Sequence, residues 1–356
     1  MQTVMVNASS AYPVHIGAGL LEKAGGLIAE TIKSWNCAII TDSTVEKLYA
    51  APVCRSLQDA GFRVCLHAFP AGEQNKNLTS YGKMLEFLAE NKLTRSDFAV
   101  ALGGGVVGDM AGFAAATYQR GIDFIQIPTT FLAAADSSVG GKTAIDLAAG
   151  KNLAGAFHQP KMVICDTDTF KSLPPETFAD GMAETLKHGL IADKDFFDEL
   201  MLQNPGVDKM VRRDVEIKAA VVREDEFEHG TRKFLNFGHT LGHAIEKCSG
   251  YTTSHGHAVA VGMVLAARAA ERLGYSPAGT LEQVIAANEK YHLPTQCPYT
   301  ADELYAAATS DKKRDGGSID VVVLERIGQA RTVRLDMDGL RTFVEAAVLS
   351  GQPNRS

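Results

Sequence analysis

The first half of the chain alternates short, largely apolar runs with amphipathic stretches. The apolar runs are Cys37–Ile40, Arg63–Leu66, Ala99–Leu102, Phe124–Ile127 and Met162–Cys165. Helical periodicity lies between several of them, as in 78–91, where apolar residues recur at three- and four-residue spacing. Strands that alternate with helices predict a parallel sheet with right-handed crossovers. At the start of the chain, Thr3–Val6 and Tyr12–Ile16 predict two antiparallel strands around a short turn.

The pattern changes after about Leu173, where Pro174 and Pro175 interrupt the chain and favour the start of a helix. Most of the chain beyond these prolines has helical periodicity: Glu176–Leu190, Phe196–Gln203, Asp208–Arg223, Leu241–Lys247, Ala258–Leu273 and Thr280–Tyr291. One hairpin is expected late in the chain, with strands Ile319–Glu325 and Ala330–Leu335 around Ile327 and Gly328. We therefore expect an α/β domain over 1–170 and a mainly α-helical domain over 171–356.

Composition agrees with a globular protein of about two domains, because the chain has 356 residues, 46% of them hydrophobic and 22% charged. The formal net charge of -7 argues against general attraction to nucleic acid or to an anionic membrane. We find neither a signal peptide nor an apolar run approaching about 18 residues, so no membrane anchor is expected.

The chain has six cysteines, and none of them forms a CxxC pair. Their spacings fit neither a zinc ribbon nor a disulfide framework, so we interpret them as small buried hydrophobic residues in a reducing compartment. The expected location is therefore the cytoplasm.

A glycine-rich segment, Leu102–Asp109, follows an apolar run and leads into a helical pattern. Glycines at such a place let backbone amides approach a pyrophosphate at a helix N-terminus. The spacing is not that of GxGxxG, so an ordinary strand-to-helix turn is the alternative. Asp42 ends an earlier apolar run, where an acidic residue can accept ribose hydroxyls or simply cap a helix.

Glutamate and histidine gather in three segments: Gly181–His188, Leu235–His243 and Ser254–His257. A carboxylate with imidazoles is typical of a catalytic divalent-metal site. His239 and His243 are four residues apart and share one face of a helix, which favours them as a ligand pair. The spacing leaves the remaining place open among His243, His255 and His257.

Several lysines and arginines lie in unusual surroundings. Lys142 and Lys151 lie in glycine-rich segments that we expect to be loops. The GxxxxGK pattern of a triphosphate loop fails, because Asp136 stands where its first glycine is required. Other basic residues of this kind are Arg120, Lys187, Lys218, Arg232, Lys312, Lys313 and Arg314. Such a set suits a phosphorylated, polyhydroxylated anion.

Together these features resemble the 3-dehydroquinate synthase family over essentially the whole chain. The segments that carry the resemblance are Gly103–Asp109, Tyr118–Gly121, Pro128–Thr130, Asp136–Thr143, Gly150–Asn152, Ala183–Lys187, Asp225–Glu226, Asn236–His243 with Glu246, and His255–Gly256. The resemblance implies a Rossmann-like nucleotide-binding domain followed by a helical metal-binding domain. It also implies Glu184, His239 and His255 as ligands of Zn²⁺ or Co²⁺, in place of the pair that spacing favours.

The resemblance further implies the cofactor and substrate contacts. The residues expected to contact NAD are Asp42, Glu73, Lys76, Gly104, Gly105, Val106, Asp109, Thr129, Thr130, Lys142 and Lys151. Those expected to contact substrate are Arg120, Asp136, Lys142, Asn152, Lys187, Lys218, Arg232, Asn236, His243 and one or both of Lys312 and Lys313. Catalytic roles fall to Lys142, Lys151, Asn152 and His243. One departure is visible, since His257 stands where the family usually has glutamate.

The activity that the resemblance implies is a carbon–oxygen lyase reaction of aromatic amino acid biosynthesis (the shikimate pathway). The substrate 3-deoxy-D-arabino-heptulosonate 7-phosphate is oxidised transiently with NAD, loses phosphate by β-elimination, is reduced, and closes to 3-dehydroquinate by an intramolecular aldol step. A homodimer is implied, with no nucleic-acid or membrane partner. The alternatives are another sugar phosphate cyclase, a metal-dependent polyol dehydrogenase of the same fold, and a non-enzymatic sensor that binds NAD and metal.

Overall fold

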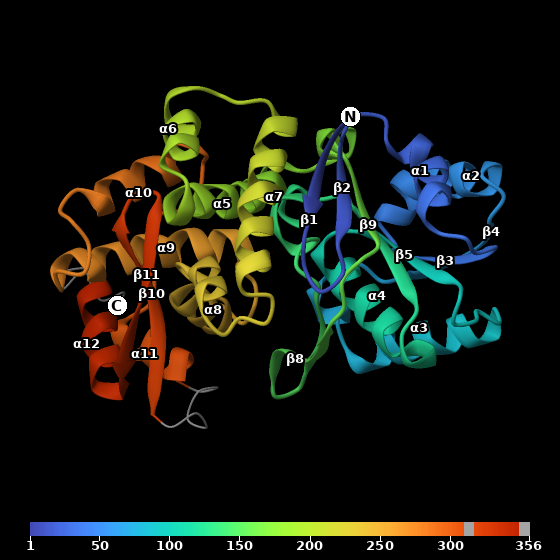
Figure 1. The fold of residues 1–356 in the computed structure, drawn as a ribbon. Helices are drawn as coiled ribbons and strands as arrows, with labels where there is room; N and C mark the ends of the chain where they lie inside the picture. Colours follow the sequence, from blue (N-terminus) through green and yellow to red (C-terminus); the bar gives the residue numbers. More distant parts are fainter. Residues whose placement is uncertain (310–316, 349–356) are drawn as a thin grey trace. The chain divides into compact units, whose positions relative to one another are not determined.

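The protein is described from a computed structural model, which covers residues 1–309 and 317–348, and it divides into two units (Figure 1). The first unit comprises Met1–Pro174 and Gly206–Phe227, and the second comprises Pro175–Pro205 and Glu228–Ser356. The chain first leaves the α/β unit close to the boundary expected near residue 170. Residues 206–227 then return to that unit, which is therefore discontinuous in sequence.

A seven-stranded sheet forms the centre of the first unit. In spatial order its strands are β1 (Gln2–Val6), β2 (Tyr12–Gly17), β9 (Met162–Asp166), β6 (Asp123–Pro128), β5 (Phe98–Gly103), β3 (Asn36–Asp42) and β4 (Arg63–Phe69). Every neighbouring pair from β2 through β9, β6, β5 and β3 to β4 is parallel. The edge strand β1 pairs with β2 in the antiparallel sense. The predicted parallel sheet, its five apolar strands and the opening antiparallel pair are all confirmed.

Both faces of this sheet are covered, which explains why its central strands are continuously apolar. On one face, Ile39 and Val100 pack with helices α1 (Ala24–Thr31) and α2 (Ala51–Asp59). On the other face, residues of the same strands pack with α3 (Leu78–Glu90) and α4 (Gly105–Thr117). Figure 1 shows the two helix pairs on opposite sides of β3 and β5.

Shorter elements connect the strands of the first unit. They are η1 (Leu21–Lys23), η2 (Glu46–Ala50), η3 (Glu73–Asn75), η4 (Tyr118–Arg120), η5 (Ala133–Ser137) and η6 (Thr167–Ser172). A separate antiparallel hairpin is made by β7 (Lys142–Leu147) and β8 (Gly150–Phe157). The expectation that Lys142 and Lys151 lie in loops is therefore wrong, because both residues lie on the strands of this hairpin.

Helix α7 (Val207–Glu224) completes the first unit and packs against β1, β2 and η5. Its apolar side is buried through Met210, Val211, Val215 and Val222. The sequence predicted the helix itself but placed it in the second domain.

The second unit is mainly helical, as predicted. Its elements are α5 (Pro175–Ala192), α6 (Lys194–Leu202), η7 (Thr231–Asn236), α8 (His239–Cys248), α9 (His255–Arg272), α10 (Thr280–Lys290), α11 (Ala301–Thr309), β10 (Ser318–Arg326), β11 (Gln329–Asp336) and α12 (Met337–Ala347). Helix α9 is central, since it contacts α5, α8, α10 and α12 and is buried along most of its length. The expected late hairpin is confirmed by the antiparallel pairing of β10 with β11.

The cysteines differ partly from expectation. All six are free thiols, but only Cys37 and Cys165 are buried, and the other four are half-buried. Half-buried positions arise because Cys65, for example, lies on the edge strand β4 rather than inside the sheet. Among the described residues, no helix combines the length and apolar character that crossing a bilayer requires.

The buried carboxylate of Asp97 ties the start of β5 to the start of β3. One oxygen accepts from Ser34 Oγ at 2.7 Å and from Asn36 Nδ2 at 3.1 Å. The other accepts from the backbone N–H of Thr94 at 2.6 Å and from its hydroxyl at 2.8 Å. Burial alone would raise the pKa of Asp97, but these hydrogen bonds outweigh it and hold the pKa below its ordinary value.

We expect Asp97→Asn to lower the free energy of unfolding at neutral pH by about 1–3 kcal/mol, because an amide NH₂ then faces donors. Because the pKa of Asp97 is lower in the folded state, its carboxylate stabilises the fold at pH values above the unfolded-state pKa of about 3.9. This stabilisation is lost as the pH falls through the folded-state pKa. The difference between wild type and variant in urea unfolding should therefore shrink below about pH 4. Asp168→Asn, at an exposed ion pair with Lys171, serves as control and should change little.

Candidate functional site

A buried carboxylate on α5 is the centre of the candidate metal site. The side chain of Glu184 is fully buried, and Oε2 accepts a hydrogen bond from the ammonium of Lys187, three residues later on the same helix. Lys187 is itself 1% exposed, so the two opposite charges of this ion pair compensate each other inside the second unit. This ion pair directs the other oxygen, Oε1, toward the histidines of α8 and α9.

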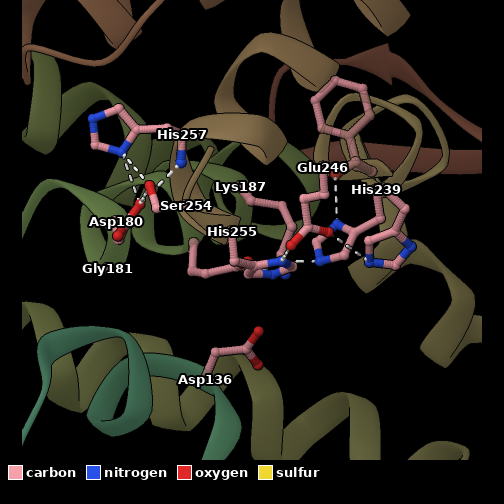
Figure 2. Close-up of polar contacts among 12 residues, drawn as sticks. Asp136, Asp180, Gly181, Lys187, His239, Glu246, Ser254, His255 and His257 are labelled. Carbon is pink, nitrogen blue, oxygen red and sulfur yellow. Dashed lines mark hydrogen bonds and ion pairs between the residues drawn. The ribbon is translucent and has the colours of Figure 1, made fainter. Parts of the chain in front are cut away.

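Two imidazoles approach Glu184 Oε1 from different helices, and Figure 2 labels both of them, His239 and His255. His239 Nε2 lies 3.6 Å from it and His255 Nε2 lies 3.3 Å from it. The three donor atoms all lie within 4.8 Å of one another. The structure therefore brings together the three residues that the resemblance implied.

Close helix packing at two glycines places these imidazoles. A Cβ on Gly262 of α9 would lie 2.1 Å from the carbonyl oxygen of Gly238, just before α8. A Cβ on Gly256 would lie 2.3 Å from Cα of Asp180 on α5. Neither position has room for a side chain, so α9 packs directly on the backbone of both neighbours.

The histidines begin their helices, which differs from the sequence prediction. Helices were expected from Leu241 and Ala258, but α8 starts at His239 and α9 at His255. The first turns of α8 and α9 contain few apolar residues, because the side chains there face polar partners. A prediction based on apolar periodicity therefore starts both helices too late.

The two imidazoles have opposite electrostatic surroundings. Burial and the nearby ammonium of Lys187 lower the pKa of His239 to about 3, which keeps a lone pair on that ring. Burial also disfavours the charged form of His255, but the nearby carboxylates of Glu184 and Glu246 outweigh it and raise its pKa to about 10. A dication held by these donors would take the place of the proton that the raised pKa favours on His255, which leaves both imidazoles neutral.

Glu246 is a site residue whose role sequence reasoning missed, although it was part of the family resemblance. Its buried carboxylate lies 3.7 Å from His255 Nδ1 and 4.0 Å from His243 Nε2. Its position three residues after His243 and seven after His239, on the same face of α8, is the signal that could have identified it. A carboxylate behind a ligand histidine fixes the orientation of the ring.

His243 is placed differently from the spacing-based prediction. Its side chain is 60% exposed and belongs to a second donor group with Glu246 and His255. The pair His239–His243 shares a helix face as expected, with ring centroids 5.5 Å apart. It is His255, rather than His243, that joins His239 at Glu184.

The donor set fits a divalent metal. One carboxylate and two neutral imidazoles are ligands that Zn²⁺ and Co²⁺ accept, and three protein ligands leave a position open for substrate. The charge of the site also fits a dication. Two buried carboxylates, Glu184 and Glu246, lie at the site, and Lys187 neutralises only that of Glu184.

The glycine-rich segment forms a turn into α4, as predicted. Gly104 is the residue before the helix, and a Cβ there would lie 3.0 Å from Thr130 Cγ2. The backbone N–H of Thr129 donates to Gly103 O at 3.0 Å, which holds the neighbouring strand ends together. Asp42 Oδ1 accepts from the N–H groups of Thr44 and Val45 at 2.8 and 3.0 Å, so it caps the following turn.

Several predicted NAD contacts form one network in the first unit. Lys76 Nζ donates to Asp109 Oδ2 at 2.6 Å and to Asn152 Oδ1 at 2.5 Å. Lys151 pairs with Glu73 at 3.3 Å. Burial would lower the pKa of Lys76, but Asp109 and Glu73 outweigh it and raise the pKa.

The remaining predicted site residues lie in three settings. In the first unit, Lys218 pairs with Asp136, and Arg120 is exposed at the end of η4 with φ of 68°. In the second unit, Arg232 is buried, and Asn236 donates to Glu228 at 2.8 Å. Lys312 and Lys313 lie outside the described residues.

The fold is shared with synthases and dehydrogenases of known structure. It matches 2-deoxy-scyllo-inosose synthase complexed with carbaglucose-6-phosphate, NAD⁺ and Co²⁺, with TM-score 0.86 and 26% identity over 97% of this chain and 99% of that one. It also matches ValA, the 2-epi-5-epi-valiolone synthase of Streptomyces hygroscopicus subsp. jinggangensis 5008 with NAD⁺ and Zn²⁺ bound, with TM-score 0.85 and 27% identity over 97% of each chain. A glycerol dehydrogenase of Schizosaccharomyces pombe, 14% identical over 94% of this chain and 88% of that one with TM-score 0.67, shares the fold alone.

Sequence comparison narrows this class of two-unit enzymes to one family. Family models for the 3-dehydroquinate synthase N-terminal and C-terminal regions match residues 66–180 and 181–314. A 3-dehydroquinate synthase of Enterococcus faecalis (strain ATCC 47077 / OG1RF) is 45% identical over 352 residues, covering 97% of this chain and 98% of the relative. One of Streptococcus suis (strain 05ZYH33) is 45% identical over 343 residues, covering 94% and 97%. The chain belongs to the 3-dehydroquinate synthase family.

The network around Lys76 gives a test of the first unit. We expect Lys76→Met to lower the free energy of unfolding by about 3 kcal/mol, because it leaves the half-buried Asp109 carboxylate without its cation. Adding Asp109→Asn should recover part of that loss, since the uncompensated charge is then removed. Urea unfolding of the two single variants and the double variant measures both effects. If the loss in the double variant equals the sum of the two single losses, the pairing of Lys76 with Asp109 is contradicted.

Proposed function

We propose that this chain is an enzyme that converts 3-deoxy-D-arabino-heptulosonate 7-phosphate to 3-dehydroquinate and phosphate. The observation that carries the proposal is the cluster of Glu184, His239 and His255, built on a buried carboxylate, in a chain of this family. The structural relatives solved with NAD⁺ and with Co²⁺ or Zn²⁺ support the same pair of cofactors here.

NAD, when bound, supplies a hydride acceptor that is restored at the end of the reaction. We propose that the amides at the start of α4, around Gly104, Gly105 and Val106, accept its pyrophosphate, because a helix N-terminus favours an anion. Further contacts are proposed for Asp42, Glu73, Lys76, Asp109, Thr129, Thr130, Lys142 and Lys151. The capping role of Asp42 is compatible with this, because its two capping bonds use only Oδ1.

Zn²⁺ or Co²⁺, when bound, supplies a Lewis acid that polarises a substrate hydroxyl and lowers its pKa. Glu184, His239 and His255 are the proposed ligands. Lys187 holds the Glu184 carboxylate, and Glu246 orients the His255 ring. His243, on the same helix face and largely exposed, is proposed to exchange a proton with substrate.

The substrate is a phosphate ester with a carboxylate, so cationic side chains should bind it. We propose contacts from Arg120, Asp136, Lys142, Asn152, Lys187, Lys218, Arg232, Asn236 and the pair Lys312 and Lys313. Lys142, Lys151 and Asn152 lie on the β7–β8 hairpin. Lys151 and Asn152, together with Arg120, are proposed to bind the departing phosphate.

Location and assembly are further parts of the proposal. Six free thiols fit a reducing compartment, and we propose the cytoplasm. A homodimer is proposed from family membership, and sedimentation equilibrium would test it. A polyol dehydrogenase is disfavoured, because the dehydrogenase relatives share the fold alone.

The reaction itself can be tested directly. With the heptulosonate phosphate, catalytic NAD and Co²⁺, the purified chain should release phosphate continuously while absorbance at the NADH band stays at baseline. A polyol dehydrogenase would instead accumulate NADH with glycerol-like alcohols and release no phosphate. Neither signal would appear with a sensor that only binds its ligands.

Replacement of Glu184 tests the metal site. Glu184→Gln should weaken Co²⁺ binding at least about 10-fold and abolish turnover, because it removes an anionic ligand while keeping the shape of the side chain. Chelator competition gives the affinity, and circular dichroism checks the fold. The matched control is Glu303→Gln, which changes an exposed residue in the first turn of α11 whose carboxylate accepts hydrogen bonds from Thr300. This variant should bind metal as wild type does.

A further inference from the structure

The N-terminus of α9 is capped by a residue from another helix. Ser254 occupies the position before α9, yet its side chain makes no capping hydrogen bond to the helix. Asp180 of α5 takes that role, because its Oδ1 accepts the backbone N–H of His257 at 3.0 Å. His257 is the third residue of α9, whose amide a helix cap ordinarily satisfies.

The same oxygen of Asp180 draws in two side chains from the start of α9 (Figure 2). It accepts from Ser254 Oγ at 2.6 Å, and His257 Nδ1 lies 2.8 Å from it. Ser254 Oγ and His257 Nδ1 are 2.9 Å apart, so the three groups close a small ring of polar contacts. A single carboxylate oxygen therefore holds the first turn of α9 through one backbone and two side-chain contacts.

This contact lies one helical turn from the proposed ligand Glu184 on α5, and within the same first turn as the proposed ligand His255 on α9. Asp180 precedes Glu184 by four residues, so the two side chains lie on the same face of α5. His255 lies between Ser254 and His257, the two residues that Asp180 holds. Gly256 allows the contact, because a Cβ there would overlap the backbone of Asp180.

We propose that Asp180 is a positioning residue for the metal centre: by capping α9 from α5, it sets the separation of His255 from Glu184. The proposal rests on the metal site of the proposed function. The alternative is that Asp180 only stabilises the second unit, as many helix caps do.

His257 takes part in this arrangement rather than in the metal site. Its Nδ1 faces Asp180, and Figure 2 shows the ring on the Asp180 side of the start of α9. A glutamate at this position would place a second carboxylate beside Asp180. In this chain His257 and Asp180 therefore form a complementary pair, with an imidazole rather than a second carboxylate facing the aspartate.

The test measures metal affinity in the full chain. Co²⁺ affinity is obtained by chelator competition, and the visible absorption of bound Co²⁺ reports ligand geometry. We expect Asp180→Ala to weaken binding about 10- to 100-fold, in the range found for residues that orient metal ligands, and to alter the Co²⁺ spectrum. Asp180→Asn keeps an acceptor oxygen for the backbone N–H, so it should lose less.

A matched control separates positioning from general stability. Asp336 caps α12 in the same unit by accepting from Gly339 N at 2.7 Å, and α12 carries none of the proposed ligands. Asp336→Asn and Asp180→Asn should lower thermal stability comparably, while only the latter changes Co²⁺ affinity and spectrum.

The pairing of residues 180 and 257 gives a second, independent readout. His257→Glu should weaken Co²⁺ binding in the wild-type background, because two carboxylates then face each other. The same substitution should cost less in the Asp180→Asn background, so the two changes should be non-additive. Additive effects would show that the pair is not coupled and would overturn this part of the proposal.

The outcomes distinguish this proposal from the proposed function. Wild-type Co²⁺ affinity in both Asp180 variants, with binding lost in Glu184→Gln, would overturn the role of Asp180 and leave the metal site intact. An equal loss of affinity in Asp336→Asn would also overturn it, since stability would then explain the effect. Retention of metal by Glu184→Gln would instead remove the metal site itself.

Discussion

The burial of one carboxylate, that of Glu184, constrains the arrangement of the second unit. A buried charge is tolerated only when it is compensated, and here an ammonium takes one oxygen while two imidazoles face the other. Lys187 comes from the same helix, but His239 and His255 come from α8 and α9. Three helices must therefore meet at one point, and the packing around that point follows from this requirement.

The two units bring candidate residues from separate elements together in different ways. In the second unit, glycines let helix backbones touch, so short side chains such as histidine can converge. In the first unit, the long side chain of Lys76 spans the gap instead, joining Asp109 of α4 to Asn152 of the β7–β8 hairpin. Each set of candidate residues is held by polar contacts within its own unit.

The sequence predicted the elements whose burial is regular. Strands such as β3 and β5 are buried on both faces and read as continuous apolar runs, and α3 and α7 show clear helical periodicity. The β7–β8 hairpin was not predicted, because its second strand is largely exposed and contains glycine, lysine and asparagine. The candidate ligand set could not be derived from spacing, since the approach of α9 to Glu184 is a tertiary contact. It was proposed only from the resemblance to a family.

Discontinuity of the first unit has a consequence for dissecting the protein. The chain crosses between the units after Pro174, after Pro205 and after Phe227, so neither unit is a single stretch of sequence. A fragment ending near residue 170 would lack α7, and with it the cover over β1 and β2 and the cation that pairs with Asp136. Recombination between relatives is therefore expected to preserve function best when residues 206–227 are inherited together with the N-terminal half.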